Sequence, residues 1–171
     1  MTLTRTDVRF IVFDAAKDAE GVVSKWRAAM GTEPDVVADG PSFARALNTI
    51  QPEDTLAVMT HGNGNGDRRF STGGRYGEIA QFDELPLTRC CTLYLLACYQ
   101  DQLPPMFVAK RALYCDGLAR TKTIERIIAA MADAPDVHDP EGVRGLVKWM
   151  TNHWAAHPKR DSPSRSGKGR S

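Results

Sequence analysis

Two short apolar runs, each ending in turn residues, constrain the fold of this chain more than any other feature. Residues 55–60 lead into His61 and Gly62, and residues 92–97 lead into Cys98. Continuous apolar runs of strand length are typical of strands buried on both faces of a parallel sheet. Because ligands of open parallel sheets bind at the carboxyl ends of the strands, neighbouring strands here would bring His61 and Cys98 together at that edge.

The rest of the chain alternates predicted strands with predicted helices. Apolar and β-branched runs predict strands at 8–13, 35–38, 55–60, 92–97 and 110–115, and turn residues predict a hairpin within 68–81. Apolar residues at helical spacing predict helices at 18–30, 39–50, 121–132 and 141–156. This alternation predicts an α/β fold, with a mostly parallel sheet flanked by helices on both faces.

Composition sets the expected setting and the domain count. We expect one domain over residues 1–157 and a disordered basic tail over residues 158–171, where five residues are basic and one is acidic. The net charge of +1 gives no general attraction to nucleic acid, which is not expected as a partner. The apolar stretches are too short to cross a membrane, and the first residues lack the layout of a signal peptide.

The four cysteines show neither disulfide nor zinc spacing. We therefore expect a cytoplasmic, reducing setting, with no metal and no cofactor. His138, His153 and His157 are expected to be surface or partly buried residues without a role in metal binding. Cys98 has two readings at this point. It could be a buried core residue, as free cysteines often are, or a nucleophile activated by His61.

The two strand ends resemble those of the caspase-like cysteine peptidases, which include caspases, metacaspases, legumain, gingipains, separase and the CHAT proteases. In that group the catalytic His is followed by Gly after one core strand, and the catalytic Cys follows the next core strand after a small residue. His61-Gly62 and Ala97-Cys98 match those positions, and a Gly-rich loop lies between them. The resemblance covers roughly residues 8–117.

The resemblance implies a caspase-like fold and a cysteine endopeptidase that acts on a protein or peptide substrate. Cys98 would attack the scissile carbonyl, and His61 would protonate the departing amine and later activate water. The backbone N–H groups of Gly62 and Cys98 would form the oxyanion hole. Because the chain is short beside multi-domain relatives, an activating partner, a homodimer or a cleavage event is left open as the step that orders its loops.

The resemblance also implies a specificity pocket at the carboxyl ends of three strands, which supply Asp14, Leu96 and Asp116. Two acids would favour Arg or Lys in the substrate through charge pairing. Aspartates at such positions also commonly cap loops and helices, so both interpretations stay open. Leu96 departs from the pattern, because members that cut after basic residues often carry an acid there and caspases carry Gln.

Two other functions stay open on the sequence. The loop HGNGNGDRR combines glycines with Arg68 and Arg69, a composition that can cradle phosphate, although it lacks the Lys-Ser/Thr of a P-loop. A nucleotide- or phosphate-binding α/β protein is therefore one alternative. The other is a catalytically inactive caspase-like module that serves protein contacts.

Overall fold

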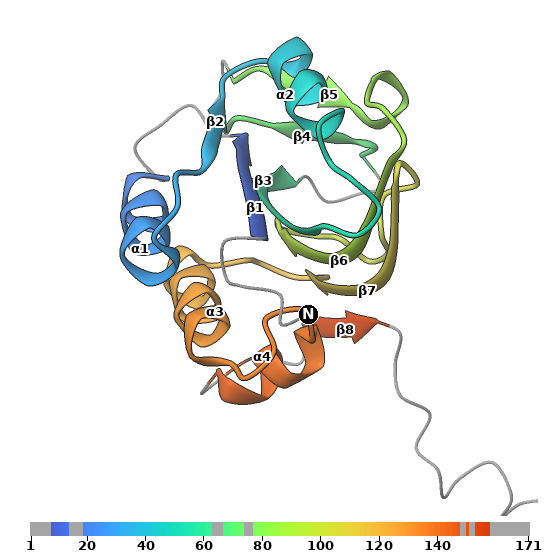
Figure 1. The fold of residues 1–171 in the computed structure, drawn as a ribbon. Coiled ribbons are helices and arrows are strands. Elements are labelled where there is room, and N and C mark those ends of the chain that lie inside the picture. Colours follow the sequence, from blue (N-terminus) through green and yellow to red (C-terminus); the bar gives the residue numbers. More distant parts are fainter. Residues whose placement is uncertain are drawn as a thin grey trace, which may run out of the picture.

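A mostly parallel sheet forms the centre of the molecule. The computed structural model describes residues 8–13, 19–62, 67–73, 77–147, 150 and 153–157. The strands in chain order are β1 (Val8–Phe13), β2 (Asp35–Val37), β3 (Thr55–Gly62), β6 (Thr88–Leu96), β7 (Phe107–Cys115) and β8 (Trp154–His157). They lie in the order β2-β1-β3-β6-β7-β8, all parallel except β8, which is antiparallel to β7 (Figure 1).

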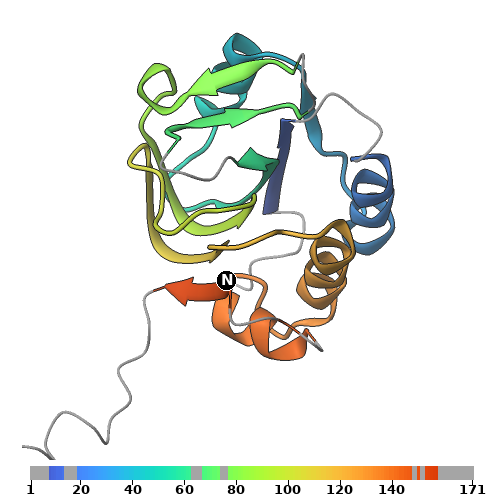
Figure 2. The same cartoon turned by 180° about the vertical axis from the view of Figure 1, so that it is seen from behind.

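Helices cover both faces of this sheet, as the alternation predicts. One face carries α1 (Glu20–Met30), α3 (Thr121–Asp133) and α4 (Pro140–Leu146) (Figures 1 and 2). The other face carries α2 (Gly40–Leu47), the short helix η2 (Phe82–Glu84) and an antiparallel hairpin of β4 (Arg69–Ser71) and β5 (Ile79–Gln81). The mixed α/β class, the mostly parallel sheet and the hairpin are thus confirmed.

The apolar runs are continuous because their strands are buried on both sides. In β3, Ala57 and Met59 pack toward α1 and α3, whereas Leu56 and Val58 pack toward α2 and the hairpin. The same alternation in β6 sends Tyr94 and Leu96 to the first face and Leu93 and Leu95 to the second. Successive side chains of a strand point to opposite faces, so a strand between two helical layers is apolar at every position.

The ends of the first two helices follow local sequence signals. Gly31 ends α1 in the left-handed region, with φ of 70°, where glycine is favoured. Asp39 begins α2 with a capping box, in which its side chain accepts from the Ser42 N–H at 2.7 Å. These hydrogen bonds from Ser42 lower the pKa of Asp39.

The helix predicted over residues 141–156 is wrong. Helix α4 ends at Leu146, Val147 has an extended backbone, and the chain returns as β8 along the edge strand β7. Gly142 and Gly145 weaken the helix, and β7 offers free backbone groups that residues 154–157 pair with. Leu146 is 50% exposed, whereas Trp154 is buried, although a single helix over 141–156 would turn both toward the core.

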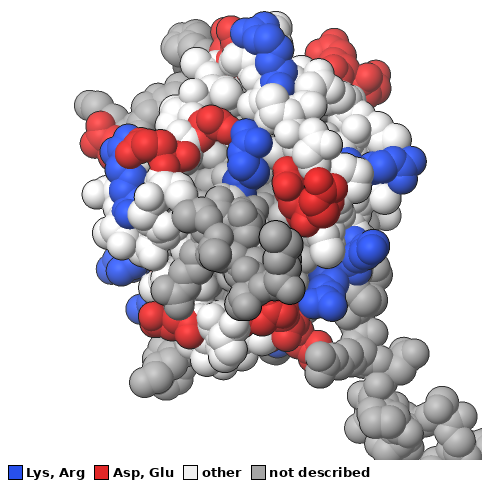
Figure 3. All heavy atoms as spheres, viewed as in Figure 1, with Lys and Arg blue, Asp and Glu red and all other residues white. Residues whose placement is uncertain are grey.

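Surface properties complete the description. None of the described helices has the length and apolar character needed to cross a lipid bilayer. Basic and acidic side chains are interspersed on the face seen in Figure 3, in keeping with 22 basic and 21 acidic residues in the whole chain. The predicted basic tail, residues 158–171, lies outside the described residues.

Trp154→Ala is expected to lower the free energy of unfolding by about 3–5 kcal/mol, because it empties a buried aromatic site. Leu146→Ala is the matched control, and because Leu146 is half exposed it is expected to change stability by no more than about 0.5 kcal/mol. Urea denaturation measures both. A single helix over 141–156 would bury both side chains, so large losses in both variants would contradict the observed β8.

Candidate functional site

The pairing of β3 with β6 brings His61 and Cys98 to the same level of the sheet. The last pair in the parallel register is Met59 opposite Leu96. His61 and Cys98 each stand two residues beyond that pair, at the carboxyl ends of neighbouring strands. Parallel neighbours lie about 4.8 Å apart, so the sheet itself places the imidazole-bearing and thiol-bearing residues side by side. This is the edge at which open parallel sheets bind ligands.

Gly62 fits closely against the peptide of Cys98. A Cβ atom on residue 62 would overlap the Cys98 carbonyl oxygen and lie 2.6 Å from Nε2 of Gln100. Gln100 is buried and donates from Nε2 to the same carbonyl at 3.0 Å. Only glycine permits this approach of one backbone to the other. The oxyanion role of the Gly62 and Cys98 N–H groups stays a prediction.

The β4–β5 hairpin forms a wall beside the His61 ring. Strand β4 pairs antiparallel with the end of β3, with His61 opposite Ser71. At the end of β4, Gly73 has φ of 87°, and a Cβ atom there would lie 2.7 Å from Nε2 of His61. Gly73 therefore meets two demands at once: a left-handed backbone and contact of the ring with bare backbone. His61 is partly buried.

The Cys98 thiol contacts the backbone of Ala119 on two sides. The Ala119 N–H donates to Sγ at 3.2 Å, and Sγ lies 3.8 Å from the Ala119 carbonyl oxygen, to which the thiol donates. Burial raises the pKa of Cys98, and the Ala119 N–H opposes that rise. Ala119 immediately precedes Arg120, the N-cap of α3, so the sulfur lies near the positive end of that helix dipole. The Ala119 N–H is therefore a donor already in place to stabilise the thiolate form of this sulfur.

The turn after Cys98 is held by the loop that follows β7. The Tyr99 N–H donates to the Gly117 carbonyl and the Gln100 N–H to the Cys115 carbonyl, both at 2.7 Å. Tyr99 has φ of 56°, an uncommon value for a residue with a bulky side chain, and its ring is 48% exposed. Surrounding contacts must hold such a strained backbone, and strain of this kind clusters at functional sites.

Of the three residues predicted for the specificity pocket, the structure describes Leu96 and Asp116. Asp14 lies outside the described residues. Leu96 has no exposed surface and packs in the core against α1 and α3, beneath the strand ends. Asp116 is at the predicted edge, half exposed, but Nδ1 of His153 lies 2.8 Å from its Oδ1. Of the two described residues, Asp116 is the one that lies beside the Cys98 turn with an accessible side chain.

The remaining histidines are His138 and His157. His138 lies at the opposite edge of the sheet, where its Nδ1 contacts Oγ1 of Thr55 at the start of β3, at 2.5 Å. The side chain of His157 is not among those described. Within the described part of the chain, no three His, Cys, Asp or Glu side chains gather closely enough to hold a metal ion.

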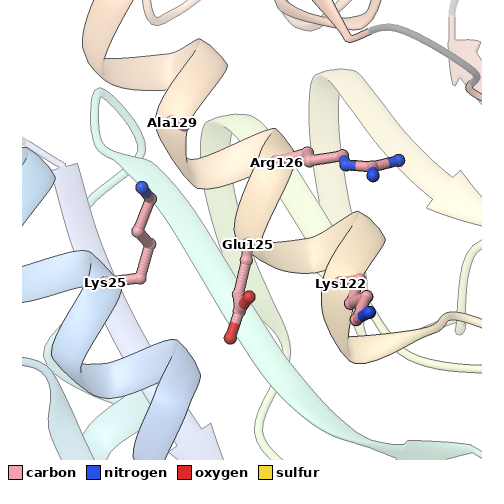
Figure 4. A pocket seen from close by; sticks show the side chains of 5 residues that line it. All are labelled: Lys25, Lys122, Glu125, Arg126 and Ala129. Carbon is pink, nitrogen blue, oxygen red and sulfur yellow. The ribbon is translucent and has the colours of Figure 1, made fainter.

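The centre of the Gly-rich loop behind the phosphate-binding alternative, residues 63–66, lies outside the described residues. Of its two arginines, Arg69 contacts Asp67 at 3.4 Å, and Arg68 is exposed. A pocket of about 300 Å³ lies elsewhere, between α1 and α3 (Figure 4). It is lined by Lys25, Lys122, Glu125, Arg126 and Ala129.

Sequence reasoning missed four groups at this site. Ala119 acts through its backbone N–H, which no side-chain motif reveals. Gln100 lies in the turn after Cys98, and His153 immediately precedes β8. The positions of both depend on long-range hydrogen bonds that a local sequence pattern does not reveal. Gly73 carried a usable signal, because paired glycines in a predicted hairpin turn suggest a left-handed backbone.

Comparison with protein-family models gives no match, and comparison with curated protein sequences gives none either.

Alkylation of Cys98 by iodoacetamide is expected to accelerate as pH rises, with a midpoint above that of a free cysteine, because burial raises the pKa of the thiol. Ala119→Pro removes the N–H and should slow the reaction at pH 7.5 by roughly tenfold. Ala119→Gly keeps the donor and should leave the profile unchanged. Cys90 and Cys115, whose pKa values burial raises to about 12 and about 11, should react more slowly. Peptide mass mapping measures each cysteine, and a Cys98 midpoint below that of a free cysteine would show that burial does not dominate the ionisation of this thiol.

Gly62→Ala is expected to lower the free energy of unfolding by about 1–3 kcal/mol, because the added methyl group forces the ends of β3 and β6 apart. Gly145→Ala adds the same methyl group where nothing lies within 4 Å and should be neutral or slightly stabilising. Thermal or urea unfolding of both variants tests the close approach. Equal stability of the two variants would argue against it.

Proposed function

We propose that this protein is a cysteine endopeptidase of the caspase-like type, with Cys98 as nucleophile and His61 as general acid and base. The observation that supports this most strongly is the placement of both residues at one level of adjacent parallel strands, with Gly62 fitted against the Cys98 carbonyl. In caspase-like peptidases the His-Gly and small-residue-Cys motifs follow neighbouring core strands in the same order. Ala97 supplies the small residue here.

The proposed reaction begins when the Cys98 thiol loses its proton to His61. The thiolate attacks the carbonyl carbon of the scissile peptide and forms a C–S bond, and the negative charge moves to the carbonyl oxygen. When this intermediate collapses, the C–N bond breaks and the imidazolium of His61 gives its proton to the departing amine. Water, deprotonated by His61, then hydrolyses the thioester, releases the acid product and restores the thiol.

Backbone donors would stabilise both charges that form during this sequence. The Gly62 and Cys98 N–H groups are proposed to face the oxyanion, and the lack of a Cβ at residue 62 lets its backbone lie against the Cys98 peptide. The Ala119 N–H already lies 3.2 Å from Sγ and would stabilise the thiolate before it attacks. A preformed donor of this kind lowers the energy of the ionised nucleophile without any rearrangement.

Cleavage after Arg or Lys is part of the proposal, and Asp116 is its main support. The carboxylate is half exposed at the edge that holds Cys98, so a guanidinium or ammonium group could reach it. It already contacts His153, so the substrate's cation would compete with an imidazole for that carboxylate. Asp14 is the second proposed partner of the basic group.

A second candidate is a catalytically inactive caspase-like module that serves protein contacts. The observation in its favour is the raised pKa of Cys98, which keeps the sulfur as a thiol in the resting state. A thiol is a poor nucleophile, so this protein would then need a binding event to become active, or would never hydrolyse peptides.

A panel of fluorogenic peptides that differ in the residue before the scissile bond tests the proposal. We expect hydrolysis of the Arg and Lys peptides, reduced at least a thousandfold in Cys98→Ala and in His61→Ala because each removes a group that takes part in bond breaking. Asp116→Asn should reduce cleavage after Arg by about 10- to 100-fold, the worth of a hydrogen bond to a charged group.

Three outcomes would change the assignment. Hydrolysis that survives Cys98→Ala would show that Cys98 is not the nucleophile. Preference for Asp, Asn or an apolar residue would refute the basic pocket but keep the peptidase. Failure of every peptide and of a peptidyl acyloxymethyl ketone to react at Cys98 would favour the inactive module.

A further inference from the structure

We propose that His153 is a positioning residue for the Cys98 thiol, which it reaches through the loop after β7, and that it thereby couples the C-terminal strand β8 to the candidate active site. The inference deepens the proposed function, since it names what holds the nucleophile of that site. It concerns the thiol itself, however, and can be tested without any substrate.

The first link joins His153 to the start of the loop. The Asp116 N–H donates to the His153 carbonyl at 2.9 Å, and the two side chains meet at 2.8 Å between Nδ1 and Oδ1. The imidazole also lies against Gly117, where a Cβ atom would come within 2.8 Å of its Cγ. His153 therefore contacts this loop through its carbonyl, its ring nitrogen and its ring face.

The second link joins the same loop to Cys98. The Gly117 carbonyl accepts from the Tyr99 N–H at 2.7 Å, and two residues later the Ala119 N–H donates to Sγ at 3.2 Å. Tyr99 holds a strained φ of 56°, which persists only while such contacts fix it. A shift of residues 116–119 would thus move the turn that carries Cys98 and the donor that its thiolate needs.

The third link anchors His153 itself. It immediately precedes Trp154, which is 2% exposed and pairs with Cys115 in the antiparallel register of β7 and β8. Arg144 at the end of α4 donates from Nε to the Trp154 carbonyl at 2.8 Å. The place of His153 is therefore fixed by how β8 docks, so the C-terminal strand and the thiol are connected through a chain of direct contacts.

The His153–Asp116 contact is well suited to a local role. Both side chains are at least half exposed, and pairs of this kind contribute little to global stability. Variants of His153 should therefore fold, with a Tm within about 3 °C of the parent protein. A large change in the reactivity of Cys98 in these variants would then come from a shift of residues 116–119 and not from a loss of global stability.

Two variants separate the bond from the ring. His153→Phe keeps an aromatic ring against Gly117 but cannot donate to Asp116, and His153→Asn places an amide nitrogen near the position of Nδ1 while removing the ring. The measured quantity is the iodoacetamide rate of Cys98 at pH 7.5 divided by that of Cys91 in the same molecule. Cys91 is also partly buried and serves as the internal reference.

We expect this ratio to fall roughly five- to tenfold in His153→Phe, as the Ala119 donor is displaced from the sulfur, and to stay within about twofold of the parent in His153→Asn. Asp116→Ala is a second variant in case the phenylalanine impairs folding, and should lower the ratio in the same direction because it removes the acceptor for the His153 ring. An unchanged ratio in both His153→Phe and Asp116→Ala would overturn the proposal. So would a rise in the ratio, or a loss that asparagine does not rescue. Because no hydrolysis is measured, an inactive module with a positioned thiol would still satisfy this test.

Discussion

The carbonyl oxygen of Cys98 fills the space that any side chain on residue 62 would need, and the candidate site depends on this close approach. Where β3 ends, its backbone meets the first turn after β6 without an intervening Cβ. The side-chain amide of Gln100 donates to the same carbonyl oxygen. His61 and Cys98 are thus held by a backbone contact rather than by a flexible loop. The contact joins Gly62, which follows His61, to the peptide of Cys98 itself.

The level of the two residues is set further down the same strands. Between Leu56 and Met59, and between Leu93 and Leu96, every side chain is buried in one of the two core layers. A slip of one residue would exchange the two faces of a strand and put each side chain into a layer shaped for its neighbour. Packing on both faces therefore fixes the register, and the register fixes which residues meet at the carboxyl edge.

This explains how much of the fold the sequence predicts and where prediction ends. Strands buried on both faces leave an unbroken apolar run, and Gly31 and Asp39 mark helix ends, so the elements and their order can be read locally. The segment from Gly142 to Trp154 has helical spacing too, but its outcome depends on the free edge of β7, which no local pattern reveals. Long-range backbone pairing overrode local propensity there.

The candidate site can be divided in the same way. The placement of His61, Gly62 and Cys98 at the carboxyl edge could be predicted because they stand where two apolar runs end. Topology predicts Asp116 at this edge. Its contact with His153 could not be predicted, because the helix incorrectly predicted over residues 141–156 places His153 within a helix rather than beside Asp116. Leu96 shows that position near the strand end does not by itself predict exposure. The alternation of side chains along β6 directs Leu96 into the core.

The burial that positions Cys98 also opposes its chemistry. The packing around the turn raises the pKa of the thiol, and every unit of that rise adds about 1.4 kcal/mol to forming the thiolate. The Ala119 N–H, just before α3, acts in the other direction, and it belongs to the loop that contacts His153. Under the proposed function His61, whose ring lies beside Gly73, would also favour the thiolate. The protonation of the proposed nucleophile would therefore depend on two segments, the β4–β5 hairpin and the loop that β8 secures. A change in either one alters the fraction of thiolate without touching Cys98 itself.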